Sequence, residues 1–478
     1  MLTRLSAVLV AALALAVAGC GGDEGGGAGS GGSAAGIVPA STAVYLSVNA
    51  DIDSDQWQQL LELIRKFPDH EKFEAAILES LSEEGVDWKR DVEPALGPEV
   101  GIAVLLDGDT PIVIGLTQAD DKAKLDKLLD QGNEPAVTDE VDGWTIVAQK
   151  QADLDAFQTA REAGTLGGDE TFTSAVDGLP GDSLATVYIG GEGVKKLVDQ
   201  VAQGAASGDQ LGEFKSFAAA VTSEDNGLRL EGVARGVGGG DAGEPYTPKL
   251  LERVPAGSLA VLSFKGQSGQ FDRLRQNQAL SEQLVEVERF LGVKLEEIAA
   301  LFEGEGVLYV RSASPFPEGT LYLTVEDEAA AKRTLATLTG KLQALAEGVT
   351  VKQTTIEGIA ATEVDAGPVS VYFATLDGLL AVTTSPAGLR NLRSLERSIE
   401  DDDEFKRAKE ASGLGDETSG FFYLDLDALG PLIEGFAGLA DEGLPPEVIE
   451  NLRPLDSFVV FAERDGDEFT VSGFLGVH

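Results

Sequence analysis

The segment Val38–Val48, with the sequence VPASTAVYLSV, occurs again in similar form as Val254–Phe264, VPAGSLAVLSF. Each copy opens on Val-Pro-Ala and continues into a run of apolar and β-branched residues, which is the composition of a buried β-strand. Two related openings far apart in one chain of 478 residues predict an internal repeat, in which each copy starts with the same strand.

The same order of elements follows each opening strand. Apolar residues spaced three and four apart, as in Trp57–Phe67, predict a helix. Two apolar strands joined by a turn come next, Val100–Leu106 with Ile112–Leu116 in the first copy and Val307–Val310 with Leu321–Val325 in the second. Because these runs do not alternate with polar residues, we expect both faces of the strands to be covered.

The later part of each copy also has a counterpart in the other. The matched elements are helix starts with a Thr three residues before an Asp (Thr117 with Asp120, Thr324 with Asp327), Phe-containing acidic helices (Asp169–Val176, Asp403–Ala411), β runs (Ala185–Ile189, Gly420–Leu424) and final strands (Gly227–Val233, Glu468–Phe474). The second copy has an additional segment around Ile356–Phe373. We therefore expect an α+β fold with two related domains from an internal duplication. Each should be a mostly antiparallel sheet with helices packed on it.

The N-terminal residues predict export and lipidation. A single positive charge at Arg4 precedes a short apolar stretch, Leu5–Val17, which is too short to span a bilayer and has the flanks of a secretory signal. The run Val17-Ala18-Gly19-Cys20 resembles the lipobox of bacterial lipoproteins, in which the cysteine is acylated and becomes the new N-terminus. Cys20 is the only cysteine, so it has no disulfide partner within the chain. Lipidation at Cys20 implies attachment to the outer face of the cell membrane.

Composition places the domain boundaries. We predict a signal peptide over 1–19, a flexible Gly/Ser-rich tether over 20–36, a first repeat over 37–236, a linker over 237–249 and a second repeat over 250–478.

The lipobox, the Gly-rich tether, the Val-Pro-Ala opening strand and the alternating hairpins and acidic helices together resemble an uncharacterised bacterial family. That family, often found in actinobacterial exported lipoproteins, is known only as domain of unknown function three-three-five-two. The resemblance spans roughly 37–478 and rests on small, apolar and turn residues. It implies an exported α+β protein and transfers no functional residue.

The charge of the chain excludes some partners. Lys and Arg number 36 against 81 Asp and Glu, which gives a formal net charge of −45. Nucleic-acid binding depends on basic residues that neutralise phosphates, so we expect no nucleic-acid partner. The same charge repels anionic head groups, and membrane attachment should therefore come from the acyl chains at Cys20. The acidic surplus also fits either high solubility or a saline habitat.

Few residues are available for metal or nucleophilic chemistry. The two histidines, His70 and His478, form no pair at metal-ligand spacing, and we expect no metal and no cofactor. Gly181-Asp182-Ser183-Leu184 is similar to the nucleophile block of GDSL-type esterases, but it follows a turn and no Asp-x-x-His block follows it. A serine without a positioned base is a weak nucleophile, so we predict no enzyme here.

Two acidic segments are better explained as helix starts than as calcium sites. Asp51, Asp53, Asp55 and Glu62 match four positions of an EF-hand loop, but Gln56 stands where the loop needs glycine. We expect Asp53 or Ser54 to be a helix N-cap instead. Asp401–Glu404 similarly predicts a negatively charged helix start before Phe405. Gly304-x-Gly306 precedes a strand and is therefore no dinucleotide loop.

Two classes of function remain. The first, which we favour, is a membrane-anchored extracytoplasmic lipoprotein that acts as a non-enzymatic binding or interaction protein of the cell envelope, with an unknown envelope protein as its partner. The alternative is a carrier of a lipid or other amphiphilic ligand, which requires an apolar cavity of several hundred cubic ångströms. An enzyme that uses only carboxylates would require convergent buried acids with perturbed pKa values.

Overall fold

The computed structural model forms two compact units. The first consists of Met1–Gly239 with Leu444–Asp456 and Ala462–His478, and the second of Gly240–Gly443 with Ser457–Phe461. The residues that the structure describes are 32–72, 88–107, 110–131, 136–201, 214–236, 243–266, 278–313, 316–346, 348–367, 369–430 and 446–478. The chain first passes from one unit to the other between Gly239 and Gly240. The final strand, which the sequence placed in the second repeat over 250–478, belongs instead to the first unit, because Glu468–Gly476 pairs with Gly227–Arg235.

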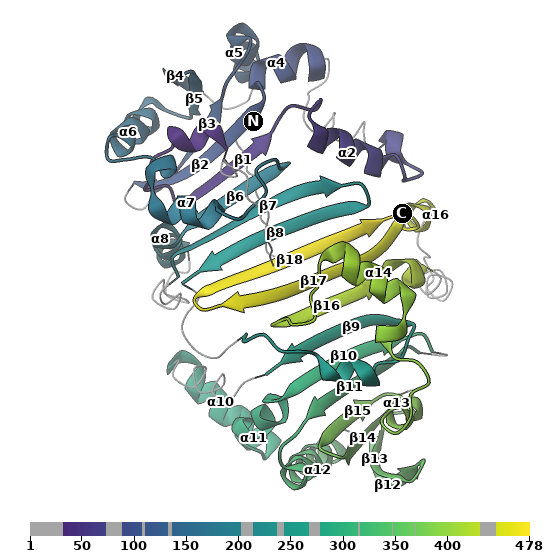
Figure 1. Cartoon of the computed structure of the whole chain (residues 1–478). Helices are drawn as coiled ribbons and strands as arrows, with labels where there is room; N and C mark the ends of the chain where they lie inside the picture. Colours follow the sequence, from purple (N-terminus) through teal and green to yellow (C-terminus); the bar gives the residue numbers. More distant parts are fainter. Residues whose placement is uncertain are drawn as a thin grey trace. The chain divides into compact units, whose positions relative to one another are not determined.

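The first unit is an antiparallel sheet around β1 (Val44–Asn49), which pairs with β2 on one side and β6 on the other (Figure 1). Antiparallel pairing continues outward from β2 through β3 and β5 to β4, and from β6 through β7 and β8 to β18. These strands are β2 (Glu99–Asp107), β3 (Thr110–Thr117), β4 (Val137–Val141), β5 (Trp144–Ala148), β6 (Ala185–Gly190), β7 (Ser216–Glu224), β8 (Gly227–Arg235) and β18 (Glu468–Val477).

The second unit has an antiparallel sheet around β9 (Ser258–Lys265), which pairs with β10 and β16. From β10 the pairing continues through β11, β15, β14 and β13 to β12. These strands are β10 (Glu305–Arg311), β11 (Glu318–Thr324), β12 (Thr350–Ile356), β13 (Ile359–Asp365), β14 (Ser370–Leu376), β15 (Leu379–Thr383) and β16 (Gly420–Asp425). Residues Ser457–Phe461 of β17 (Leu455–Asp465) also belong to this unit.

Helices pack on these sheets, so the chain is an α+β protein built on antiparallel strands. In the first unit they are α2 (Asp55–Ile64), α4 (Glu93–Leu96), α5 (Lys122–Gln131), α6 (Gln151–Glu162), α7 (Glu170–Val176), α8 (Gly191–Val201) and α16 (Pro446–Leu452). In the second unit they are α10 (Gln278–Leu291), α11 (Leu295–Ala299), α12 (Glu328–Leu345), α13 (Pro386–Asn391) and α14 (Asp403–Ser412). Within the described part of the chain, no helix is long and apolar enough to cross a membrane.

The two Val-Pro-Ala segments are held in the same way. The backbone N–H of Leu166 donates to the carbonyl of Val38 over 2.8 Å, and that of Ile399 donates to the carbonyl of Val254 over 2.8 Å. Both valines are fully buried. Pro39 forms an isolated β-bridge with Thr165, and Pro255 forms one with Ser398. Thr165 and Ser398 each precede a short 3-10 turn. Each opening segment is therefore fixed to the loop before a later acidic helix of its own unit.

The two acidic helices carry equivalent aromatic contacts into the cores. The side chain of Asp169 accepts from the N–H of Phe172 at the start of α7, and that of Asp402 accepts from the N–H of Phe405 at the start of α14. The ring of Phe172 meets that of Tyr188 edge-on at 4.9 Å between centroids. Phe405 meets Tyr423 in the same manner at 5.1 Å. The negatively charged helix start before Phe405 is thus confirmed.

Strand β2 is buried on both faces, as its continuous apolar sequence predicts. Ala103 and Leu105 belong to the main core of the first unit, while Ile102 and Val104, on the opposite face, are also buried. Leu46 of β1 lies opposite Ile102 in the sheet and is 3% exposed. The apolar run is therefore explained by packing on two sides.

Part of the segment assigned to the tether lies inside the first unit. Ser33–Gly36 forms a 3-10 turn, η1, in which Ala34 is fully buried. The carboxylate of Glu99, the first residue of β2, accepts from the backbone N–H of Ser33 at 2.9 Å and from that of Ala34 at 3.3 Å. A carboxylate at the start of a helical turn satisfies N–H groups that have no partner within the turn. This partner, distant in sequence, is the reason composition alone placed the boundary too late.

Candidate functional site

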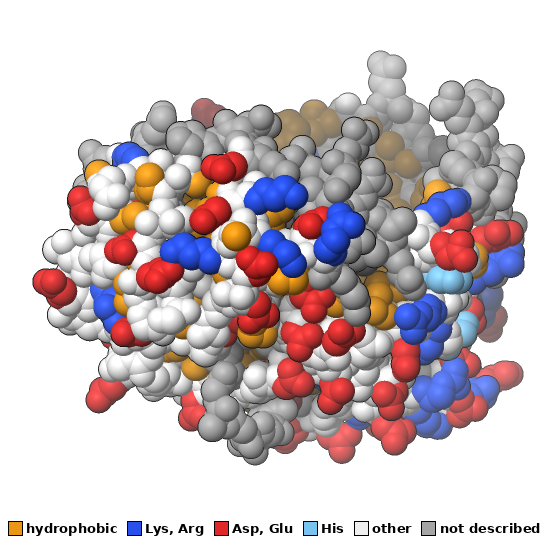
Figure 2. Space-filling view, turned by 90° about the horizontal axis from the view of Figure 1, so that it is seen from above, with side chains coloured by type: hydrophobic (Ala, Val, Ile, Leu, Met, Phe, Trp, Pro, Cys, Tyr) orange, Lys and Arg blue, Asp and Glu red, His pale blue; other side chains and the backbone are white. Residues whose placement is uncertain are grey.

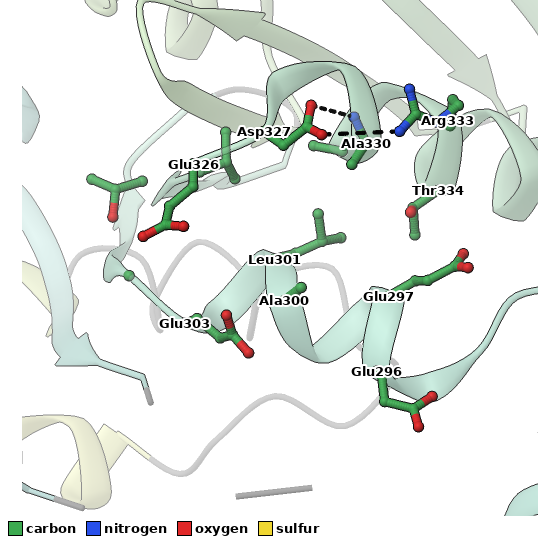
Figure 3. A pocket seen from close by; sticks show the side chains of 14 residues that line it. Glu296, Glu297, Ala300, Leu301, Glu303, Glu326, Asp327, Ala330, Arg333 and Thr334 are labelled. Carbon is green, nitrogen blue, oxygen red and sulfur yellow. Dashed lines mark hydrogen bonds and ion pairs between the residues drawn. The ribbon is translucent and has the colours of Figure 1, made fainter. Parts of the chain in front are cut away.

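The candidate site is a pocket of about 630 Å³ in the second unit (Figure 3). Its walls are α11 with the following 3-10 turn η6 (Ala300–Phe302), the end of β11, and the first two turns of α12. Gly304 lets the chain turn from η6 into β10, because a Cβ atom at this position would lie 2.0 Å from the side-chain oxygen of Thr324. The glycine of Gly304-x-Gly306 therefore serves close packing beside the pocket.

Five carboxylate side chains line the pocket, against one guanidinium from Arg333. Figure 3 shows them around the space between the two helices; they are Glu296, Glu297, Glu303, Glu326 and Asp327. Asp327 is the N-cap of α12, where its side chain accepts from the N–H of Ala330 at 2.9 Å, and it lies 4.0 Å from Arg333. Glu297, Glu303 and Glu326 are exposed, and no ion pair joins them to another described residue. The rim is therefore strongly negative.

The floor of the pocket is apolar. Leu301, Val325 and Ala331 are at most 8% exposed and belong to one small hydrophobic cluster beneath α12. Figure 3 shows the Leu301 side chain directed into the space between the helices. An apolar floor under a negative rim suits a ligand with an apolar body and a positive group. In the described part of the chain, no group of three His, Cys, Asp or Glu side chains is arranged to hold a metal ion.

A second cavity, of about 500 Å³, lies on the other side of α12, between this helix and strands β12, β13 and β14. Its walls come from Leu335, Ala336, Val351, Phe373 and Ala374 among others, and Lys332 is its only charged side chain. The first unit contains a smaller, polar pocket of about 290 Å³ beside Glu99. The two cavities of the second unit thus have larger volumes than this polar pocket of the first.

The second unit also contains a buried carboxylate, that of Glu318 in β11, which is 2% exposed. It accepts from the hydroxyl of Tyr309 at 3.3 Å and from that of Thr320 at 3.4 Å, and it lies 3.6 Å from the guanidinium of Arg311. Burial raises the pKa of the Tyr309 hydroxyl, and the charge of Glu318 raises it further. Paired in this way and lining neither cavity described above, Glu318 has a structural role.

Of the residues that the sequence singled out, Gly304, Thr324 and Asp327 line the acidic pocket, whereas His70 and Ser183 belong to the first unit. Cys20, the predicted lipidation site, lies outside the described residues. The Nδ1 atom of His70 is 3.0 Å from the carbonyl oxygen of Phe67, in a turn after α2. The hydroxyl of Ser183 is 3.0 Å from that of Thr186, just before and within β6.

The predicted helix starts were largely placed correctly. Ser54 is the N-cap of α2, but its side chain accepts from Asn49 rather than from the helix, while Asp51 accepts from the N–H of Asp53. The N-cap of α12 is Asp327, as predicted. In the first copy, Asp121 rather than Asp120 accepts from the N–H of Lys124 in α5.

The pocket itself was missed by the sequence analysis. Glu296, Glu297, Glu303 and Glu326 carry no motif, and they are four among 81 acidic residues. Their convergence depends on how η6 and α12 meet, which no spacing in the sequence encodes. Figure 2 shows the same difficulty at the surface, where Asp and Glu side chains are scattered widely over the face drawn.

These features define an α+β protein whose second unit contains an acidic pocket of ligand size. The chain belongs to the family described as "Protein of unknown function (DUF3352)", whose model matches residues 123–472. A search of curated proteins gave no match.

Solved structures similar to this chain include crystal forms of TP0453. Crystal form IV has a TM-score of 0.24 at 13% identity and covers 46% of this chain and 77% of that one. Crystal form III has a TM-score of 0.23 at 13% identity, with 47% and 93% coverage.

Proposed function

We propose that the protein is a lipoprotein anchored at the outer face of the cell membrane through Cys20, and that it binds a ligand without catalysing a reaction. The lipobox-like run 17–20 and the Gly/Ser-rich residues after it support the anchor. A single acyl chain binds membranes only marginally, so stable anchoring requires the several chains that lipoprotein processing attaches. The envelope is thus the site of action in this proposal.

The acidic pocket of about 630 Å³ is the observation that carries the binding function. Its volume lies within the range of about 300–1,000 Å³ that is typical of small-molecule sites. The apolar floor supplies contact area, and the carboxylates attract positive charge into a partly enclosed space. The ligand class that fits is therefore a small amphiphile with a cationic group, or a cationic side chain of an envelope partner.

Calorimetric titration with octylammonium tests this site. Replacing Glu297→Gln together with Glu326→Gln should weaken the affinity about two- to thirtyfold, since each exposed charge pair contributes about 0.2–1 kcal/mol. The matched control is Glu396→Gln with Glu417→Gln, which removes the same charge from exposed positions away from the pocket. Equal weakening in both double variants would show that only the overall charge attracts the probe.

The anchor has a separate test. Cys20→Ser should prevent both acylation and cleavage of the signal peptide, because the thiol is the acceptor of the lipid. Metabolic labelling with an alkyne analogue of palmitate, followed by gel analysis, measures the lipid on wild-type and variant protein. Labelling of the variant at the wild-type level would refute anchoring at this residue.

We also propose that the two units arose by duplication, as the sequence predicts. The strand connections support this, since β3-β2-β1-β6 in the first unit corresponds to β11-β10-β9-β16 in the second. The added hairpin β12–β13 has no counterpart among the described strands of the first unit and forms part of the wall of the second cavity. That cavity favours a second candidate function, the carrier of an amphiphile.

A further inference from the structure

The cavity beside α12 exists because small side chains face one another across it. Where α12 crosses β11 and β15, Ala331 packs with Leu323 and Leu380 in the cluster beneath the helix. Further toward β12–β14, the helix presents Ala336, Thr339 and Gly340 to the cavity.

Several side chains on the sheet side of the cavity are also small. Ala360, Thr362 and Thr375 from β13 and β14 line the cavity, and Thr375 is the direct neighbour of the core residue Leu380 in the next strand. These short side chains leave a gap beside the packed part of the helix, and the larger Leu335, Val351 and Phe373 form the rest of its walls without filling it. An apolar gap of this kind leaves its lining without contacts, and a ligand can supply them.

Two of the polar side chains on the walls have hydrogen-bond partners, whereas the buried hydroxyl of Thr375 has none among the described residues. The hydroxyl of Thr339 donates to the carbonyl of Leu335 within α12 at 2.8 Å. The side-chain amide of Gln353 donates to the hydroxyl of Thr362 at 3.0 Å. Apolar side chains such as Leu335, Val351 and Phe373 line much of the walls, which therefore favour a hydrocarbon over a polar molecule.

Charge fixes the orientation of that occupant. Lys332 is the only charged side chain that lines the cavity; it is 62% exposed and lies 3.6 Å from Glu328, one turn earlier in α12. The rest of the chain is strongly acidic and repels anions. Within this cavity, an anionic head group is therefore best placed at Lys332.

We propose that this cavity binds the hydrocarbon chain of a single-chain anionic amphiphile of the fatty-acid class, with its carboxylate at Lys332 and its tail toward Gly340. This inference rests on the carrier function, the second candidate above. The nine residues from Lys332 to Gly340 give the helical wall a length of about 12 Å, which accommodates the part of the tail nearest the head group.

Fluorescence titration with dansyl-undecanoic acid tests the proposal, with the uncharged dansyl-undecanol as the reference probe. The protein is the chain from Gly21 to His478, which contains every described residue and needs no detergent that would compete. Gly340→Phe should weaken binding of both probes at least tenfold by filling the cavity. Its Cβ meets no atom within 4 Å, so the substitution starts from open space.

Three further variants complete the design. Ala336→Trp fills the same cavity from another exposed position and guards against misfolding of Gly340→Phe, which circular dichroism also checks. Thr337→Phe, at an exposed position of α12 that lines neither cavity, should leave binding unchanged. Lys332→Gln should weaken binding of the acid about two- to fivefold, the size expected for an exposed ion pair, and spare the alcohol.

Each failure has a distinct meaning. Stoichiometric binding that survives both cavity-filling variants would overturn this site while leaving a carrier function intact. Equal affinity of Lys332→Gln and the parent for the acid would overturn the assigned head-group position. Absence of probe binding to the parent protein would refute the carrier function and this inference with it.

Discussion

Replacing Glu99→Ala should release the N-terminal turn η1 from the first unit and destabilise that unit by about 2–3 kcal/mol. Besides the two backbone bonds, the carboxylate accepts from the hydroxyl of Ser33 at 2.6 Å, from that of Ser47 at 2.9 Å and from that of Tyr45 at 3.4 Å. The bonds from Ser33 are exposed, and water replaces them at little cost. The others are partly buried, and hydrogen bonds to a charged group contribute about 1.5–3 kcal/mol.

The assay follows from the composition of the chain. All three tryptophans, Trp57, Trp88 and Trp144, precede Gly239, so their fluorescence during urea unfolding monitors the first unit. Glu99→Gln is the matched control, because its amide oxygen still accepts from an N–H and it should lose less than half as much stability. An unfolding free energy of Glu99→Ala within 0.5 kcal/mol of the parent, about the size of an ordinary surface substitution, would refute the assigned role.

Three other outcomes are expected. Gly340→Ala should stabilise the second unit by about 1 kcal/mol, since alanine favours a helix interior and its Cβ meets no atom within 4 Å; a loss in the urea-unfolding free energy would contradict this. Burial raises the pKa of Glu305 despite hydrogen bonds from the backbone of Leu250 and Lys249. The pKa of Glu305 is therefore higher in the folded protein than in the unfolded chain. Protonated Glu305 stabilises the fold below the unfolded pKa, and this stabilisation is lost as the pH rises through the folded pKa. Glu305→Gln should therefore reduce this loss, and an unchanged pH profile of stability would refute the assignment. Phe405→Ala should cost about 3–5 kcal/mol, with a matching loss in Phe172→Ala; a difference above 2 kcal/mol between their urea-unfolding free energies would argue against equivalent roles.

Much of the fold could be predicted because its signals are local. The apolar hairpins and the acidic N-caps depend on residues close together in sequence, and β2–β3 and α14 lie where the patterns place them. The hairpin β4–β5 was not predicted, although Asp142-Gly143 is a turn signal, and both residues have positive φ of 48° and 83°. The same signal occurs at Asp377-Gly378, between β14 and β15.

The remaining features depend on contacts between distant residues. Ala34 can be buried because Glu99, far along the chain, accepts from its backbone N–H. The two cavities beside α12 arise from how one helix sits on a sheet, and their lining residues, such as Leu301 and Gly340, have no pattern of their own. A single sequence indicates which residues prefer a core or a turn. A cavity, in contrast, forms where side chains from distant parts of the chain do not contact one another.

Native mass spectrometry of the protein purified from its own membrane tests the central claim, an anchored protein that carries a bound ligand, most directly. The account predicts a chain that begins at Cys20 with covalent acyl groups, together with a small molecule that collisional activation removes without breaking a covalent bond. A chain that retains residues 1–19, or an acylated chain that never carries a non-covalent ligand, would contradict it.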